Sequence, residues 1–133
     1  RGRSLLVPLL ADRDISGRVI EVDLGDSKAL VAAGPAALAL KLDRPLIAGH
    51  ISYRKVKGRW QIYAHFTDPI PVPEPNEGET QVEALTKAWV EAISPVMVEH
   101  VVDWHMMQKL FVADLDPERL ARARSRVSKG TVD

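Results

Sequence analysis

The sequence predicts an α/β fold in which a mixed, mostly parallel sheet is flanked by helices. Three observations favour this fold class. The 133-residue chain has a globular composition, with 46% hydrophobic and 27% charged residues. Short segments of strand length fill its first half, and longer segments with helical spacing fill the second. Only one predicted helix lies between strands, which gives too few crossovers for a doubly wound sheet. We therefore expect the sheet to be incomplete without an N-terminal segment.

Residues 1–68 form the predicted sheet-forming part. The continuous apolar run Ser4–Leu10 is typical of a strand covered on both faces, although Pro8 favours an edge position or a strand end. Residues 19–24 alternate, which places Glu21 and Asp23 on the face opposite the apolar side chains. Residues 25–33 are expected to form a connection.

A helix is expected to begin at Gly34-Pro35, since proline is favoured at the first helical position, and to end near Asp43. Residues 46–53 and 60–66 are the next predicted strands, separated by a basic turn. The first half of the chain therefore alternates strands with a single helix.

Residues 69–79 form a Pro-rich loop, and residues 80–133 form the predicted helical part. The spacing of apolar residues predicts a helix from Thr80 to about Val102, kinked or split by Pro95. A short helical or irregular buried segment follows. Asp116-Pro117 then begins a last helix that is rich in arginine.

Charge and composition exclude several classes of protein. The 18 basic residues balance the 18 acidic ones, so nothing favours a nucleic-acid partner. The chain has no cysteine, which excludes disulfides and thiolate chemistry. No window approaches the roughly 20 apolar residues of a membrane-spanning helix. We expect one soluble piece of an α/β protein.

Few motifs point to chemistry. The sequence contains no GxGxxG, GxxxxGK[ST] or GxSxG pattern. His100 and His105 are five residues apart, whereas two ligands on one helix face need a spacing of four, so we expect no metal site. Gly34 opens a helix whose free N–H groups favour an anion. Arg13 lies between Asp12 and Asp14 and pairs either with an anion or within a structural ion-pair turn.

The residues alone leave other readings open. The arginines of the last helix suit either solvent or an anionic membrane surface. The methionines and aromatic residues near position 104 suit either an adaptable apolar pocket or the core. The carboxylate of Glu21 lies at the centre of an apolar strand, so either that face meets water or the carboxylate has a chemical role.

Three stretches of the sequence resemble one family. They are LLVPLLADRDISGRVIEVDLGD, AAGPAALALKLDRPLIAGHISYR and HVVDWHMMQKLFVADL. The chain is similar to the C-terminal half of an actinobacterial phosphatidylinositol mannoside acyltransferase. That family belongs with the bacterial lipid A acyltransferases and, more distantly, the glycerophospholipid acyltransferases. The most specific part is Asp103-Trp104-His105-Met106-x-Gln108.

The resemblance implies that residues 1–133 are the C-terminal half of a single acyltransferase domain. The enzyme would be peripheral on the cytoplasmic face of the plasma membrane. It would move palmitoyl from acyl-CoA, a co-substrate, to a mannose hydroxyl of phosphatidylinositol mannosides, without a further cofactor.

Members of this superfamily use a histidine in a His-x-x-x-x-Asp/Glu motif as general base, supported by a later glutamate on a strand. The four histidines of this chain are followed five residues later by Lys55, Ile70, His105 and Leu110, so the motif is absent. We expect an N-terminal half to supply it, and this chain to be inactive alone. Glu21 matches the later glutamate and would support the imidazole, with Asp23 as the second choice.

The resemblance also suggests substrate contacts. Arg13, Arg54, Gly34 and His105 would meet a polar headgroup or the phosphates of CoA, while residues 36–42 and 104–111 would line an acyl groove. One alternative is a non-catalytic module for acyl-CoA, lipid or assembly. Another is an acyltransferase for a different acceptor, such as a lysophospholipid or a lipid A-like sugar.

Overall fold

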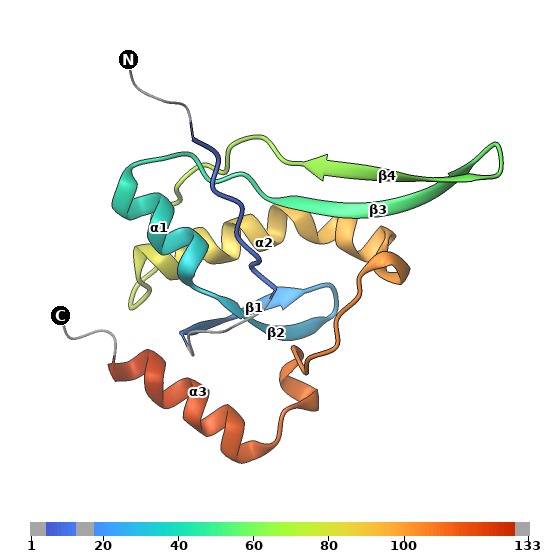
Figure 1. The fold of residues 1–133 in the computed structure, drawn as a ribbon. Helices are drawn as coiled ribbons and strands as arrows, with labels where there is room; N and C mark the ends of the chain where they lie inside the picture. Colours follow the sequence, from blue (N-terminus) through green and yellow to red (C-terminus); the bar gives the residue numbers. More distant parts are fainter. Residues whose placement is uncertain (1–4, 13–17, 130–133) are drawn as a thin grey trace.

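The computed structural model describes residues 5–12 and 18–129, which form a mixed α/β arrangement of two β-hairpins and three α-helices (Figure 1). The hairpins lie on either side of α2 (Gln81–Glu99), the longest helix. No helix in these residues is both long and apolar enough to cross a lipid bilayer.

The first hairpin pairs β1 (Val19–Leu24) with β2 (Ser27–Ala32). The predicted β1 is confirmed, but the expectation of a connection over residues 25–33 was wrong. Gly25 adopts a positive φ of 59° in a two-residue turn, which directs the chain straight back along β1. Ala29 and Val31 then face the core, so β2 alternates as a half-buried strand does.

The second hairpin pairs β3 (Gly49–Val56) with β4 (Arg59–Phe66), close to the two predicted strands. Lys57 and Gly58 make its turn with φ values of 49° and 80°, as a tight two-residue hairpin requires. The hairpin extends well beyond the rest of the molecule (Figure 1).

Both sheets are two-stranded and antiparallel, so the prediction of a mostly parallel sheet is wrong for the part of the chain that the structure describes. The expected strand Ser4–Leu10 is also absent from residues 5–10, where Leu5, Leu6 and Leu10 are exposed. A buried parallel strand needs neighbouring strands and helices over both faces. Residues 5–12 and 18–129 supply neither to this apolar run.

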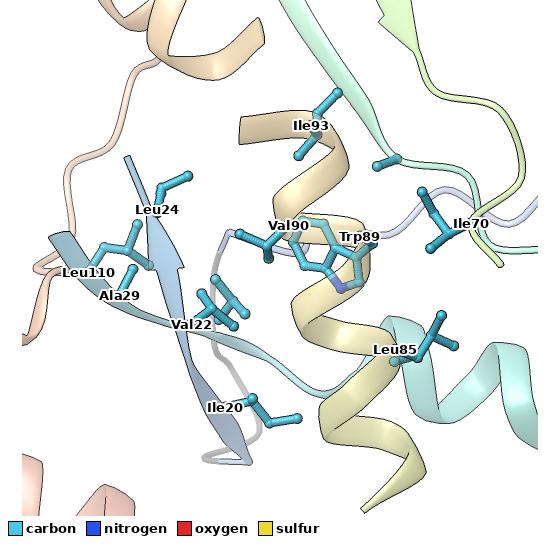
Figure 2. Packing of buried hydrophobic residues seen from close by; sticks show 13 residues of the cluster. Ile20, Val22, Leu24, Ala29, Ile70, Leu85, Trp89, Val90, Ile93 and Leu110 are labelled. Atoms are coloured by element: carbon cyan, nitrogen blue, oxygen red, sulfur yellow. The ribbon is translucent and has the colours of Figure 1, made fainter. Parts of the chain in front are cut away.

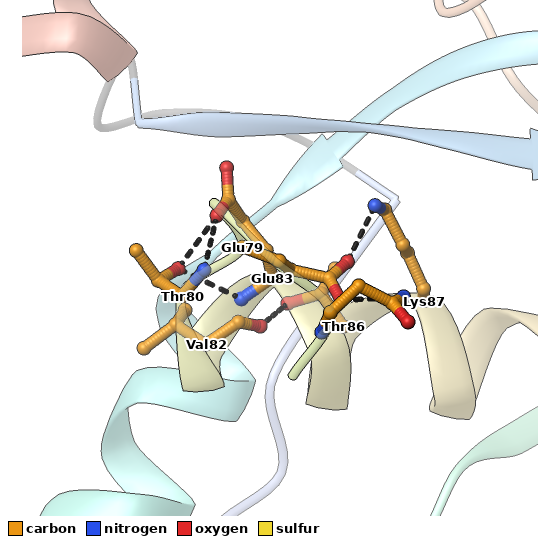
Figure 3. A network of polar contacts seen from close by, with 7 residues as sticks. Glu79, Thr80, Val82, Glu83, Thr86 and Lys87 are labelled. Carbon is orange, nitrogen blue, oxygen red and sulfur yellow. Dashed lines mark hydrogen bonds and ion pairs between the residues drawn. The ribbon is translucent and has the colours of Figure 1, made fainter. Parts of the chain in front are cut away.

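Helix α1 (Gly34–Leu42) begins with Pro35 in its first turn and ends at Asp43, as predicted. Asp43 adopts a left-handed conformation with φ 50°, and its N–H bonds to carbonyls of the last turn. Helix α2 begins at a capping box in which Thr80 and Glu83 satisfy each other's free N–H groups (Figure 3).

Pro95 does not split α2, contrary to one of the two predicted outcomes. Proline removes one backbone hydrogen bond from the helix. Ile93 before it and Val96 after it both pack on the core, so tertiary contacts hold both sides of the break in line. The helix is continuous to Glu99.

The core lies between α2 and the first hairpin (Figure 2). Leu85, Val90 and Ile93 of α2 are almost completely buried against the apolar face of β1. That face carries Ile20, Val22 and Leu24, as the alternation predicted. Glu21 and Asp23 therefore point away from the core.

The segment after α2 is irregular, with 3₁₀ turns at Val101–Asp103 and Val112–Asp114, before α3 (Pro117–Lys129). It runs along β2, where the N–H of Leu30 donates to the carbonyl of Leu110 at 3.1 Å. The indole of Trp104 donates to Asp12 at 3.1 Å. Two of the stretches that carry the family resemblance are thus tied together.

Candidate functional site

A cleft of about 970 Å³ lies beside β1. One wall is formed by residues 19–23 of β1, with Lys28 and Leu30 of β2. The opposite wall comes from α2, and Asn76 and Arg124 complete the lining. The residues of α2 in the lining are Glu83, Lys87, Glu91, Ser94 and Pro95.

The free edge of β1 forms part of this cleft. Strand β1 pairs with β2 along one edge, and no other strand within residues 5–12 and 18–129 pairs with its second edge. Five consecutive residues of β1 line the cleft, so both faces of the strand contribute to the wall. The outer edge of β2 is instead hydrogen-bonded, through Leu30 to Leu110 and through Ala32 to Ala11. The cleft therefore offers unpaired backbone groups as well as side chains.

Glu21 is the central acidic side chain of the β1 wall. Its side chain is 36% exposed, and Arg124 Nη2 of α3 lies 3.2 Å from its Oε2. Within the described residues, its Oε1 has no hydrogen-bond partner. Asp23, on the same face, is exposed and pairs with Lys28 across the hairpin. The hydrogen bond to Asp23 is the main cause that raises the pKa of Lys28.

The α2 wall carries charges at a four-residue spacing, which puts Glu83, Lys87 and Glu91 on one helix face. Lys87 donates to Glu79 at 2.5 Å (Figure 3). This bond, followed by one from the Asn76 N–H, lowers the pKa of the Glu79 carboxyl. Lys87 on this wall is thus paired with Glu79, and Glu83 is engaged with Thr80 in the capping box.

The structure does not bring the sequence-predicted site residues together. Of these, Glu21 lies in the cleft. Gly34 opens α1 away from it, and a Cβ at Gly34 would meet no atom within 4 Å, so the glycine marks no close cradle. Arg54 stacks 4.7 Å above the ring of Tyr63 on the second hairpin. His105 is exposed outside the cleft, and Arg13 lies outside the described residues. Their substrate roles remain predictions.

The predicted acyl-groove walls do not line the cleft. In residues 36–42, Ala36 is fully buried in the core. Trp104, Met106 and Phe111 pack against the same core. These apolar residues of the chain serve the interior, as one of the two readings of the segment near position 104 proposed.

The histidines lie apart from Glu21. The rings of His50, His65 and His100 gather where the second hairpin meets the end of α2, with centroids 5.1 to 6.4 Å apart. None of the three lines the cleft. In the portions of the chain that are described, no group of three or more His, Asp or Glu side chains is placed to hold a metal ion.

Sequence reasoning missed several cleft residues. The spacing of Glu83, Lys87 and Glu91 was visible as the polar face of an amphipathic helix. Nothing local marked Arg124, because its contact with Glu21 joins residues 103 positions apart. That contact depends on where α3 docks.

Comparison with known proteins gives consistent matches. Residues 1–113 match the model of the family described as bacterial lipid A biosynthesis acyltransferase. Phosphatidylinositol mannoside acyltransferases from two strains of Mycobacterium tuberculosis are 31% identical over 121 residues, which is 91% of this chain and 35% of theirs. The enzyme of that name from Mycolicibacterium smegmatis is 29% identical over 114 residues, 86% of this chain and 34% of its own. The chain thus spans about a third of the length of these relatives. It belongs to the bacterial lipid A biosynthesis acyltransferase family.

Proposed function

We propose that this chain supplies the C-terminal half of an acyltransferase that moves palmitoyl from acyl-CoA to a mannose hydroxyl of phosphatidylinositol mannosides. Membership of the family and the names of the mycobacterial relatives support this activity. Acyl-CoA is a co-substrate, and the enzyme needs no other cofactor. It works as a peripheral protein on the cytoplasmic face of the plasma membrane, where its lipid substrate is held.

The observation that carries the proposal is the position of Glu21 in the cleft beside the free edge of β1. An N-terminal half would bring a histidine in a His-x-x-x-x-Asp/Glu motif to this edge. The imidazole would take the proton of the acceptor hydroxyl, and a carboxylate bonded to its other nitrogen would fix its orientation and stabilise the imidazolium.

The geometry around Glu21 is compatible with this role. Arg124 engages Oε2, whereas Oε1 has no bond to any described residue and is free to accept from an imidazole N–H. The unpaired backbone of β1 offers hydrogen bonds to an added strand. A strand from the N-terminal half would extend the first hairpin toward the mostly parallel sheet that the sequence suggested.

The test is a palmitoyl-transfer assay of the chain combined with the N-terminal half. We expect Glu21→Gln to lower kcat by about 10²–10⁴-fold, the usual contribution of positioned acid–base groups, with little change in KM. Asp23→Asn is the comparison, because Asp23 lies on the same face and in the same cleft but pairs with Lys28, so it should keep most of the rate. A loss in Asp23→Asn alone would assign the role to Asp23, the second choice. Glu21→Asp should restore part of the rate and shift the pH profile. Full activity of Glu21→Gln would remove this residue from the mechanism.

A second candidate is a non-catalytic module that binds acyl-CoA or lipid, or that assembles with a partner chain. It is favoured by the absence of any described histidine from the cleft. Binding of palmitoyl-CoA by the combined protein without transfer to any lipid would support it. Transfer to lysophospholipids or lipid A-like sugars but not to mannolipids would keep the acyltransferase and change the acceptor.

A further inference from the structure

The second hairpin presents an apolar face to the outside of the molecule. The register pairs Tyr53 with Ile62 and Lys55 with Trp60, so these side chains share one face with Ile51 and Phe66. Trp60, Ile62 and Phe66 are 70%, 70% and 73% exposed. Buried His50 and Ser52 lie on the opposite face, toward α2. This hairpin therefore inverts the usual arrangement of apolar inside and polar outside.

The same hairpin carries a concentrated positive charge. Residues 49–66 contain four Lys and Arg side chains and no Asp or Glu, although the whole chain has zero net charge. The cations are Arg54, Lys55, Lys57 and Arg59, all exposed and all in or near the turn. Lys55 shares the apolar face and Lys57 lies in the turn, whereas the register puts Arg54 and Arg59 on the opposite face. This turn is the end of the hairpin that projects from the rest of the molecule (Figure 1).

Charge selects among possible occupants of this face. A second copy of the hairpin stacked turn to turn on the apolar face would place Lys55 and Lys57 against the same cations of its partner, and like charges in contact are unfavourable. An anionic bilayer offers phosphates to the cations and acyl chains to the apolar residues. Trp60 and Tyr53 suit the boundary between these two layers, where aromatic rings with polar edges are enriched.

We propose that the β3–β4 hairpin docks on an anionic phospholipid bilayer through Ile51, Tyr53, Trp60, Ile62 and Phe66, with Lys55 and Lys57 on the lipid phosphates. The hairpin lies flat at the headgroup level. Within residues 5–12 and 18–129 no further strand pairs with either edge of this two-stranded sheet, although the Tyr53 N–H donates to Asp103. Unpaired backbone groups are not tolerated in the hydrocarbon interior. At the interface, water and headgroups satisfy them while the side chains reach the acyl boundary.

This inference deepens the proposed function, on which it rests for the choice of a membrane, by naming the surface that meets the lipid. Of the arginines of the last helix, Arg124 is engaged with Glu21, and Arg122 Nη2 lies 3.9 Å from a carboxylate oxygen of Glu118. The docking test uses vesicles without acyl donor or mannolipid. Its result is therefore independent of acyl transfer.

The experiment measures the partition of the chain onto vesicles by co-sedimentation. One set of vesicles is phosphatidylcholine alone, and the other holds equal amounts of phosphatidylcholine and phosphatidylglycerol. We expect binding to the anionic vesicles, weakened by added salt, with a blue shift of tryptophan fluorescence as Trp60 leaves water. Lys55→Gln with Lys57→Gln should weaken binding about 30-fold, since each cation contributes about 1 kcal/mol and 1.4 kcal/mol is tenfold.

Matched controls exist elsewhere on the surface. Lys41→Gln with Arg44→Gln removes two exposed cations near the end of α1 and should leave binding unchanged. Trp60→Ser with Ile62→Ser should weaken binding at least about tenfold by removing buried apolar area at the interface. Its counterpart, Leu42→Ser with Val72→Ser, removes two exposed apolar side chains outside the hairpin and should have no effect.

Several results would overturn the proposal. One is wild-type binding that is absent, or equally strong on neutral vesicles. Another is a hairpin variant that binds vesicles as tightly as wild type. A third is a control variant outside the hairpin whose vesicle binding is weakened as much as that of the matching hairpin variant. A chain that dimerises in solution and becomes monomeric on Ile62→Ser would show that a second copy covers this face. The chain combined with the N-terminal half could transfer palmitoyl to detergent-dispersed substrate while the chain fails to bind vesicles. That result would support the proposed function but contradict the proposed docking surface.

Discussion

His50 is the most unusual single side chain outside the cleft. It is 8% exposed, and its Nε2 has no hydrogen-bond partner within the described residues. Burial is the main cause that lowers its pKa below the ordinary 6.5, and neighbouring His65 and His100 lower it further, while Asp103 acts in the opposite direction. His65 itself is held by a 2.8 Å hydrogen bond with Ser52.

This environment predicts a loss of stability on acidification. Because the pKa of His50 is lower in the folded chain than in the unfolded chain, the unfolded chain binds the proton first as the pH falls below about 6.5. The free energy of unfolding should therefore be highest above that pH and fall below it, by at most about 1.4 kcal/mol per pH unit for one proton. Denaturant titrations at several pH values should show this slope in wild type and a smaller one in His50→Leu.

His105→Leu is the control for that series, because His105 is exposed and lies outside the histidine cluster. An equal slope in wild type and His50→Leu would assign the pH dependence to other groups. A slope of opposite sign would mean that the fold stabilises the protonated imidazole, which would contradict a pKa lowered by burial.

At the same scale, the sequence predicted the orientation of Glu21 but not its partner. Alternation along residues 19–24 is local, so the face of each side chain follows from the strand period of two. Arg124 comes from a helix whose docking depends on distant packing. Likewise, Asp103 and Trp104 stood out as a family motif, but their contacts with the Tyr53 N–H and Asp12 required the folded chain.

At the scale of elements, two signals that are local in sequence predicted their elements correctly. Proline in the first turn marked α1, and the turn residues Lys57-Gly58 lie between two alternating strands. The sheet type was mispredicted because parallel pairing depends on partner strands, which residues 5–12 and 18–129 do not provide. Strand β2 was missed because the Gly25-Asp26 turn was read as the start of a loop.

The capping box of α2 gives a prediction at this scale. Thr80 accepts from the Glu83 N–H at 3.2 Å, and Glu83 accepts from the Thr80 N–H at 2.7 Å. Thr80→Ala should lower the free energy of unfolding by about 1 kcal/mol, within the usual 0.5–2 range for a lost N-cap. Chemical denaturation measures the free energy of unfolding of wild type, Thr80→Ala and Thr80→Ser. Thr80→Ser is the control, because it keeps the hydroxyl. A loss in Thr80→Ser as large as in Thr80→Ala would point to the missing methyl group and not to the cap.

At the scale of the whole molecule, burial is unevenly distributed. The interior joins the first hairpin, α1 and α2 through one cluster that includes Leu85, Val90 and Ile93. The second hairpin has a buried contact with the body on its His50 and Ser52 face, while its other face is open. A two-stranded hairpin is marginal by itself, so its outer part depends on whatever covers it.

This division predicts how stability is spread over the chain. Leu85→Ala should cost about 2–5 kcal/mol, a large part of the 5–15 kcal/mol that a typical domain has, because it leaves a cavity at the centre of the core. Ile62→Ala, on the exposed face, should change the free energy of unfolding by less than about 0.5 kcal/mol. Amide hydrogen exchange should be slowest in the middle of α2 and should speed up along the second hairpin from Gly49 and Phe66 toward Val56 and Arg59. Uniform protection along that hairpin in the free chain, or a cost for Ile62→Ala close to that for Leu85→Ala, would mean that its apolar face is already covered in solution and not left free for a lipid surface.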